Sequence, residues 1–333
     1  MTVAVTGATG FLGRALCQSL AARGDRVRAF VRRDFAFSND LLQPVHAVHF
    51  SRLADLHDAS ALRAGCAGAS AVVHLAARVH VIHERAPEAE AQYRAVNVDG
   101  TREVLLAAQA VGVRHVVIVS SVKAVGESND APWTESVVPA PTDAYGRSKL
   151  AAERLSLAFG ERHGMCITVL RLPLVYGPGA TANVLRLLSL VRRGWPLPLG
   201  AVRNRRSMVY RDNVVAAILS VLDAGTSAQG TFFVSDDADL STPELVRTIG
   251  RGVGRAARLI AVPLPLLRLV GRVGDLLRPL LPFSVTSAEV ARLSGSLTVD
   301  STRLREATGF SPRITPEEGW RRTAHWFLTG EEG

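Results

Sequence analysis

The fold is decided by the stretch Thr6-Gly7-Ala8-Thr9-Gly10-Phe11-Leu12-Gly13. It follows a strand-like run at residues 3–6 and opens a helix that we expect over residues 11–23. The three glycines match the three needs of a dinucleotide loop: a tight turn, an open approach for a pyrophosphate, and close packing of the helix. The amide groups and the positive dipole end of the helix then face the phosphates. An ordinary glycine-rich turn is the alternative, but the strand–loop–helix setting favours the dinucleotide loop.

Outward from this loop, short β-branched runs alternate with helical stretches. We expect strands at residues 3–6, 27–31, 45–50, 71–75, 115–120 and 167–172, and further helix at residues 89–111. This alternation predicts an α/β fold: a Rossmann doubly wound parallel sheet over residues 1–172.

After Arg171 the pattern changes, and prolines break the chain into loops. We expect a helix at 183–193, a strand at 207–210, a helix at 212–223, and a helix start at Ser241-Thr242-Pro243-Glu244. We interpret residues 173–333 as a smaller C-terminal α/β substrate lobe, with residues 205–224 returning to the first domain. In open α/β sheets, ligands bind at the edge that such a lobe would cover.

The composition fits a globular chain of 333 residues, with 47% hydrophobic and 21% charged residues. The three cysteines are far apart and form no CxxC pair, which predicts neither a disulfide framework nor a metal site. We see no signal peptide and no apolar run long enough to span a membrane, and we expect a cytoplasmic protein. The net charge of +9 is dispersed, which favours an anionic ligand over nucleic acid. An apolar and basic tract at residues 259–283 suits either a membrane surface or a helical flap on the lobe, and we prefer the flap.

The second strand ends in Val31-Arg32-Arg33 and has no acid at its tip. NAD-preferring sites usually place an acid there for the ribose hydroxyl, whereas arginine suits a 2′-phosphate. We therefore expect NADP(H) rather than NAD(H), with a solvated loop as the alternative explanation of the arginines. Asp55 is placed to bond the adenine, with an ordinary loop carboxylate as the alternative.

Tyr145 and Lys149 lie four residues apart in Tyr-Gly-Arg-Ser-Lys, on one face of a predicted helix. A nearby ammonium should lower the pKa of the phenol and make it usable as a general acid and base. Ser120 and Ser121 end the preceding strand, where a hydroxyl can bond the same substrate oxygen. A strand-end cap is the alternative for either serine alone.

These motifs, together with residues 74–77 (HLAA) and 170–179 (LRLPLVYGPG), resemble the extended short-chain dehydrogenase/reductase family, in its nucleotide-sugar epimerase, dehydratase and reductase branch. The resemblance covers essentially the whole chain. It implies hydride transfer at the ring of a UDP-sugar, a homodimer, and Ser121, Tyr145 and Lys149 as the catalytic residues. The implied cofactor contacts are Gly7, Thr9, Gly10, Phe11, Leu12, Gly13, Arg32, Arg33, Asp55, Leu56, Leu75, Ala76, Ala77, Asn97, Ser120, Tyr145 and Lys149.

The resemblance also implies substrate contacts in the second half. Asn183 and Arg206 match positions that contact the diphosphate, Leu199 lies in a segment resembling the uracil lining, and Arg292 is a weaker second clamp. For each isolated arginine the alternative is a surface residue. Lys123 is assigned to the substrate; it stands where 4,6-dehydratases carry the glutamate of a Thr-Asp-Glu motif, so we do not expect water elimination.

Three functions remain open. The first is reduction of a UDP-4-keto-6-deoxy-N-acetylhexosamine in surface-polysaccharide biosynthesis. The pattern from Ser120 to Glu127 and the segment Pro196-Leu197-Pro198-Leu199-Gly200 resemble bacterial members of the family with this activity. The second is a UDP-hexose 4-epimerase acting on UDP-glucose or UDP-N-acetylglucosamine. The third is a non-catalytic dinucleotide-binding subunit, which we rank last because such proteins typically lack the Tyr/Lys pair.

Overall fold

The computed structural model describes residues 1–32, 48–53, 55–79, 86–181, 183–277 and 286–332. The first half of the chain contains β1 (Thr2–Thr6), α1 (Phe11–Ala22), β2 (Arg26–Val31), β3 (Val48–Arg52), α2 (Ala59–Cys66), β4 (Ala71–His74), α3 (Ala86–Tyr93), a π-helix (Arg94–Asp99), α4 (Gly100–Ala110), β5 (His115–Ser121), a 3₁₀ turn (Val122–Ala124), α5 (Ala144–His163) and β6 (Cys166–Leu172). The second half contains β7 (Leu174–Tyr176), α6 (Asn183–Arg193), β8 (Met208–Tyr210), α7 (Arg211–Ala224), a 3₁₀ turn (Gly225–Ala228), β9 (Gly230–Phe233), α8 (Thr242–Gly252), α9 (Leu264–Leu277), α10 (Ser287–Ser294), α11 (Thr302–Thr308) and α12 (Pro316–Thr329).

Within these described residues, seven strands form one parallel sheet in the order β3-β2-β1-β4-β5-β6-β9. The order runs from β1 to β3 in one direction and from β4 to β9 in the other. It therefore reverses between β1 and β4, and ligands of open α/β sheets bind at the carboxyl ends of the strands at such a reversal. The predicted Rossmann α/β fold is confirmed.

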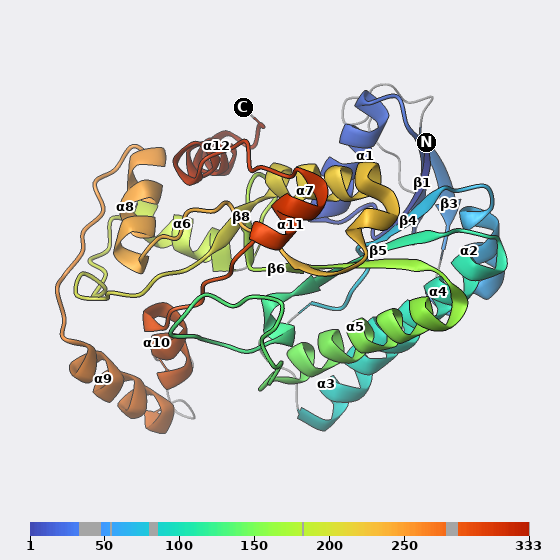
Figure 1. The fold of residues 1–333 in the computed structure, drawn as a ribbon. Helices are drawn as coiled ribbons and strands as arrows, with labels where there is room; N and C mark the ends of the chain where they lie inside the picture. Colours follow the sequence, from blue (N-terminus) through green and yellow to red (C-terminus); the bar gives the residue numbers. More distant parts are fainter. Residues whose placement is uncertain (33–47, 54, 80–85, 182, 278–285, 333) are drawn as a thin grey trace.

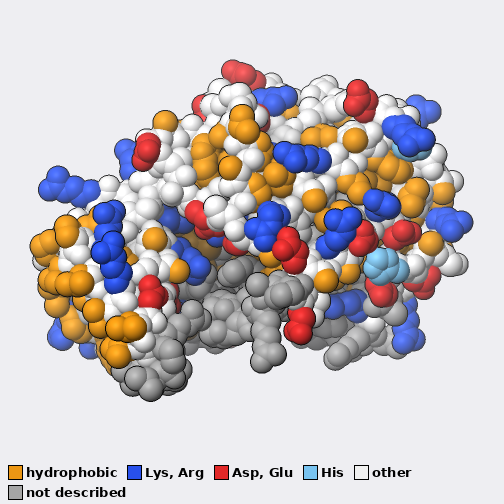
Figure 2. All heavy atoms as spheres, turned by 90° about the horizontal axis from the view of Figure 1, so that it is seen from below, with side chains coloured by type: hydrophobic (Ala, Val, Ile, Leu, Met, Phe, Trp, Pro, Cys, Tyr) orange, Lys and Arg blue, Asp and Glu red, His pale blue; other side chains and the backbone are white. Residues whose placement is uncertain are grey.

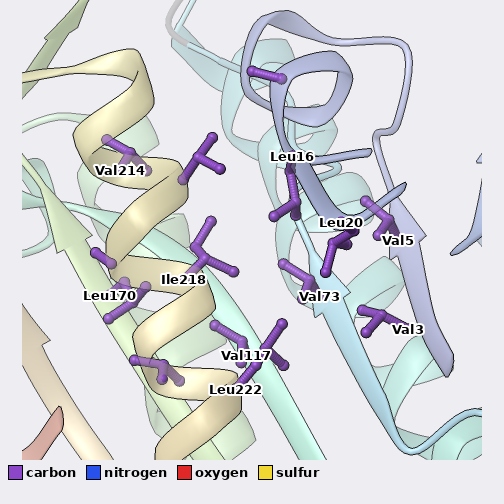
Figure 3. Close-up of a cluster of buried hydrophobic side chains, with 14 of the residues drawn as sticks. Val3, Val5, Leu16, Leu20, Val73, Val117, Leu170, Val214, Ile218 and Leu222 are labelled. Atoms are coloured by element: carbon purple, nitrogen blue, oxygen red, sulfur yellow. The ribbon is translucent and has the colours of Figure 1, made fainter. Parts of the chain in front are cut away.

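Helices cover both faces of the sheet (Figure 1). On one face of the sheet, α1 and α7 pack beside each other. On the opposite face, α2, α4 and α5 pack side by side. Figure 3 shows Leu16 and Leu20 of α1 facing Ile218 and Leu222 of α7 across Val117 of the sheet. Complete burial of an aliphatic side chain of this size stabilises the fold by roughly 1.5–3 kcal/mol. These contacts fix α7 to the sheet, although it lies far along the chain.

The predicted helix at 183–193 matches α6, and the expected helix start at residue 241 is a capping box on α8. The strand and helix expected at 207–210 and 212–223 correspond to β8 and α7. Part of the strand expected at 45–50 lies outside the described residues; β3 begins at Val48 and continues to Arg52. The prediction missed β9, which is short and starts at a glycine. The domain boundary at residue 172 stays a prediction.

A separate cluster holds β7, β8, α6, α8 and α12 together. Tyr176 of β7 stacks on Trp320 of α12 with ring centroids 4.4 Å apart, and α6 and α8 complete the cluster. β7 and β8 form a two-stranded parallel sheet at its margin. Figure 1 shows this part beside the carboxyl end of β6, with α9 and α10 at its outer end.

Candidate active site

The glycine-rich loop between β1 and α1 depends on its glycines for different reasons. Gly7 has a φ of +70°, and a Cβ on it would lie 2.7 Å from the Ala76 nitrogen after β4. A Cβ on Gly13 would lie 2.2 Å from the Gly7 oxygen, so α1 packs directly on the loop. Gly10 is the N-cap of α1 and makes no side-chain cap, and the first turn of the helix carries no acid. This geometry fits the phosphates of a dinucleotide.

The remaining loop residues assigned to the cofactor surround this turn. Thr9, Phe11 and Leu12 are half-buried, as are Leu75, Ala76 and Ala77 after β4. The Ala76 amide donates to the Thr6 hydroxyl over 3.3 Å, which ties the two loops together at the reversal of the sheet. The structure therefore brings these two predicted segments to one place.

The adenosine end of the predicted site is less fully described. Arg32 is exposed directly after β2, and Arg33 lies outside the described residues. Asp55 is exposed and accepts a hydrogen bond from the His57 amide at 3.2 Å. Leu56 packs against Gly100 at the start of α4. The Arg32 side chain is exposed to solvent, so its role at a 2′-phosphate stays a prediction, with a solvated loop as the alternative.

Ser121 and Tyr145 are brought together by a close approach between two backbone segments. A Cβ on Gly146 would lie 2.3 Å from the carbonyl oxygen of Lys123, so glycine lets the start of α5 contact the turn after β5. Asp143 caps α5 by accepting from the Gly146 amide over 2.6 Å. The Ser121 hydroxyl is hydrogen-bonded to Tyr145. Two of the three predicted catalytic residues therefore share one site.

The predicted effect of Lys149 on Tyr145 is wrong in this structure. The pKa of Tyr145 is raised to about 12, chiefly by burial and to a smaller extent by the nearby Asp143 and Tyr93, against a lowering by the Ser121 hydrogen bond. The Lys149 ammonium instead donates to the Val119 carbonyl over 2.7 Å, and burial lowers its pKa to about 8. Desolvation thus outweighs the expected charge effect.

Asn97 supports the start of α5 from the π-helix that precedes α4. Its amide nitrogen donates to the Ser148 hydroxyl over 2.9 Å, and that hydroxyl donates to the Tyr145 carbonyl over 2.7 Å. Its oxygen accepts from the Arg78 amide at 2.8 Å. The expected helix at 89–111 is therefore interrupted at Asn97 by a π-helical turn, a feature that is frequent at functional sites.

Ser120 points away from Ser121, as neighbouring residues of a strand do. Its hydroxyl donates to Glu153, which is buried and paired with Arg171 at 2.8 Å. The Ser120 hydroxyl thus belongs to a buried network of hydrogen bonds and an ion pair with Glu153 of α5 and Arg171 of β6. Its predicted cofactor contact stays a prediction.

A line of charged side chains leads from Tyr145 towards the second half of the chain. The Lys123 ammonium pairs with Glu127 and lies 3.4 Å from Asp143. Glu127 in turn acts electrostatically on Arg206. Sequence reasoning missed Asp143 and Glu127, although an aspartate two residues before Tyr145 is a recognisable N-cap signal.

The two predicted phosphate clamps lie close to each other. Arg206 donates to the Arg292 carbonyl over 2.8 Å, and its pKa is lowered by burial and then by the charge of Arg292. Arg292 is exposed on α10. Asn183 is exposed at the start of α6, whereas Leu199 is buried in a cluster with Val202, Leu267 and Val290. An adjacent pair of guanidinium groups is a suitable site for an anion such as a diphosphate.

In the described part of the chain, no group of three His, Cys, Asp or Glu side chains is placed to hold a metal ion. None of the helices in that part is long and apolar enough to cross a membrane.

A dinucleotide loop after β1 combined with a serine at the end of β5 and a tyrosine and lysine on α5 defines the extended short-chain dehydrogenase/reductase class. Residues 3–234 match the model of the NAD dependent epimerase/dehydratase family, and the chain belongs to this family. It is therefore an NAD-dependent enzyme of the epimerase/dehydratase type. The predicted family and enzyme class are confirmed, whereas the expected preference for NADP(H) is not supported.

The chain is 34% identical to a UDP-glucose 4-epimerase of Vibrio cholerae, over 98% of this chain and 95% of the relative. It is 28% identical to the N-acetyl-alpha-D-glucosaminyl-diphospho-ditrans,octacis-undecaprenol 4-epimerase of Escherichia coli O157:H7, over 97% and 94%. Among solved structures, MoeE5 in complex with UDP-glucose and NAD has a TM-score of 0.77 and 26% identity, with 99% of both chains covered.

Proposed function

We propose that the protein is a 4-epimerase that oxidises and re-reduces C4 of a hexose carried on UDP. The observation that carries this proposal is the line of charges that joins the Ser121–Tyr145 pair to the Arg206–Arg292 pair. One end offers a proton-transferring hydroxyl and the other offers two cations for a diphosphate. The two curated relatives described above are both 4-epimerases, which supports this candidate.

NAD(H), when bound, supplies the hydride acceptor and donor for the sugar carbon. The glycine-rich loop would hold its phosphates, and Lys149 would bond its nicotinamide ribose. Tyr145 would take the proton from the C4 hydroxyl during oxidation and return it during reduction, while Ser121 orients the same oxygen. Arg206 and Arg292 would hold the diphosphate and fix the sugar against the tyrosine.

We propose NAD(H) as the cofactor, in place of the NADP(H) that the sequence favours. The preference for NADP(H) depends on Arg32 and Arg33, and the comparisons do not support it. The family is described as NAD dependent, and the similar structure of MoeE5 contains NAD.

The second candidate is the 4-keto reductase, which would reduce a UDP-4-keto-6-deoxy-N-acetylhexosamine. It is favoured by the raised pKa of Tyr145, because burial disfavours the phenolate that would take a proton from a C4 hydroxyl, whereas the phenol can still donate to a carbonyl oxygen. The missing acid after Val31 also fits a reductase that uses NADPH. The homodimer, the cytoplasmic location and the absence of nucleic-acid binding stay predictions.

Product analysis separates the two candidates. The protein would be incubated with NAD⁺ and either UDP-glucose or UDP-N-acetylglucosamine, and the sugar products would be resolved by NMR, with Tyr145→Phe as the inactive control. An epimerase forms the C4 epimer with no net change in NADH absorbance. Failure to form an epimer, together with one NAD(P)H consumed for each UDP-4-keto sugar reduced, would establish the reductase instead.

A further inference from the structure

Helix α9 packs against the protein through one narrow face. Leu267, Gly271 and Gly274 are its buried residues, spaced at i, i+4 and i+7. A Cβ on Gly271 would lie 2.9 Å from the Ser287 Cα, so the backbones of α9 and α10 are in direct contact. Leu267 joins the cluster that contains Leu199 and Val290. The helix is thus firmly seated on the outer end of the second half of the chain.

A different face of α9 is apolar and open to solvent. This face consists of five residues at the helical spacing i, i+3, i+4, i+7 and i+10: Leu266, Leu269, Val270, Val273 and Leu276. Each of them is between 47% and 78% exposed to solvent. Figure 2 shows a dense group of hydrophobic side chains at the left end of the molecule, where Figure 1 places α9. A surface helix of a globular protein normally carries polar residues on the face turned away from the core. A contiguous apolar stripe of this kind marks a binding surface.

The charges beside this stripe are positive. Arg268 and Arg272 are exposed one turn apart, on the helix sector between the stripe and the buried face. The one acid of α9, Asp275, accepts a hydrogen bond from the Ser287 amide at 3.2 Å and so faces α10. An apolar stripe bordered by arginines matches a helix that lies in the interface of a membrane, with its apolar side chains among the acyl chains and its cations among anionic headgroups.

We infer that α9 docks the protein on the surface of a bilayer that contains anionic phospholipid. The helix has 14 residues, about 21 Å at the α-helical rise, which suits lying in the interface and is too short to span the hydrocarbon core. A second copy of the chain fits less well, because an antiparallel two-fold pairing through the stripe would bring two sets of arginines to the same side. Since α10 carries Arg292, docking would hold the arginine pair close to the membrane surface. This inference does not depend on which sugar carrier the site accepts.

Vesicle flotation tests the inference. The full chain would be mixed with vesicles of phosphatidylcholine alone or of phosphatidylcholine with phosphatidylglycerol. We expect wild type to float with the anionic vesicles. Leu269→Glu/Val273→Glu should reduce binding about tenfold or more, because two buried aliphatic side chains are replaced by anions. Arg268→Gln and Arg272→Gln should each reduce binding to anionic vesicles about fivefold and leave binding to neutral vesicles unchanged.

Val138→Glu is the matched control, because Val138 is an apolar residue with 84% exposure outside α9. It should bind vesicles like wild type. Thermal unfolding and NAD binding would confirm that each variant is folded, and Leu276→Glu replaces the double variant if that one is unstable. Wild type that stays in solution with both kinds of vesicle would overturn the inference. A dimer, seen by light scattering, that dissociates in Leu269→Glu/Val273→Glu without any vesicle binding would assign the stripe to a second copy instead.

Discussion

Replacing Gly13 with alanine tests whether close packing of α1 on the dinucleotide loop is required for stability. The added Cβ would lie 2.2 Å from the Gly7 oxygen and 2.7 Å from the Ala8 Cα, whereas carbon contacts are favourable at roughly 3.5–4.0 Å. Both obstacles are backbone atoms and cannot rotate away, so the helix would have to shift by about 1 Å. Overpacking of this kind costs up to about 3 kcal/mol, and alanine regains about 1 kcal/mol in helix propensity. We expect a net loss of about 2 kcal/mol in the free energy of unfolding.

Gly10→Ala is the matched comparison. Its Cβ would meet the Gly7 oxygen at 3.1 Å, and alanine is a poorer N-cap than glycine, so the loss should stay below about 1 kcal/mol. Its main effect should be weaker NAD binding, because the methyl group occupies the approach of the pyrophosphate. Urea unfolding followed by tryptophan fluorescence measures the first quantity, and calorimetric titration of NAD measures the second. A Gly13→Ala variant as stable as wild type would refute the packing argument, and normal NAD affinity in Gly10→Ala would refute the phosphate argument.

Four further outcomes are expected. Tyr145→Phe should lose about two to four decades of turnover in a product assay and keep NAD affinity, since only the proton-transferring hydroxyl is removed; near-normal turnover would exclude Tyr145 from proton transfer. Arg292→Ala should weaken calorimetric binding of UDP by about tenfold or more and leave NAD binding unchanged, and unchanged UDP affinity would contradict the clamp. Burial lowers the pKa of Lys149 from 10.5 to about 8, so between these two pH values the unfolded chain binds more protons than the folded one. The free energy of unfolding of wild type should therefore rise with pH in this range, relative to that of Lys149→Met. Urea unfolding measures both, and parallel pH curves would show that the pKa is not lowered. NADH should bind at least as tightly as NADPH, and Arg32→Ala should change neither affinity; a selective loss of NADPH affinity would restore the preference for NADP(H).

Local sequence signals were enough to predict the elements around the site. The glycine-rich loop, the strand that ends in Ser121 and the helix that carries Tyr145 each have a signal within a few residues. For the same reason, α6 and the start of α8 were predicted at their observed positions. The family followed from the order of these motifs along the chain.

Effects that depend on distant residues were not predictable in this way. The pKa of Tyr145 depends on how deeply the completed fold buries it, and the hydrogen bond of Lys149 depends on a carbonyl of β5. The partner of Ser120 is Glu153, which comes from another element. β9 consists mostly of residues that favour strands, but it has only four residues, and it is the edge of β6 that pairs with it.

The path of the chain between the sheet and the second half has a consequence for folding. After β6 the chain leaves the sheet through β7 and α6, returns with α7 and β9, leaves again with α8 to α10, returns with α11, and ends in α12. Strand pairing of β6 with β9 and packing of α1 on α7 therefore join residues that are distant in the sequence. Such contacts need large loops to close first, which makes folding slow. A nascent chain that stops at residue 172 would expose an edge of β6 and the apolar face of α1, so we expect such truncations to aggregate, and ribosome-bound intermediates of this length to need protection by chaperones.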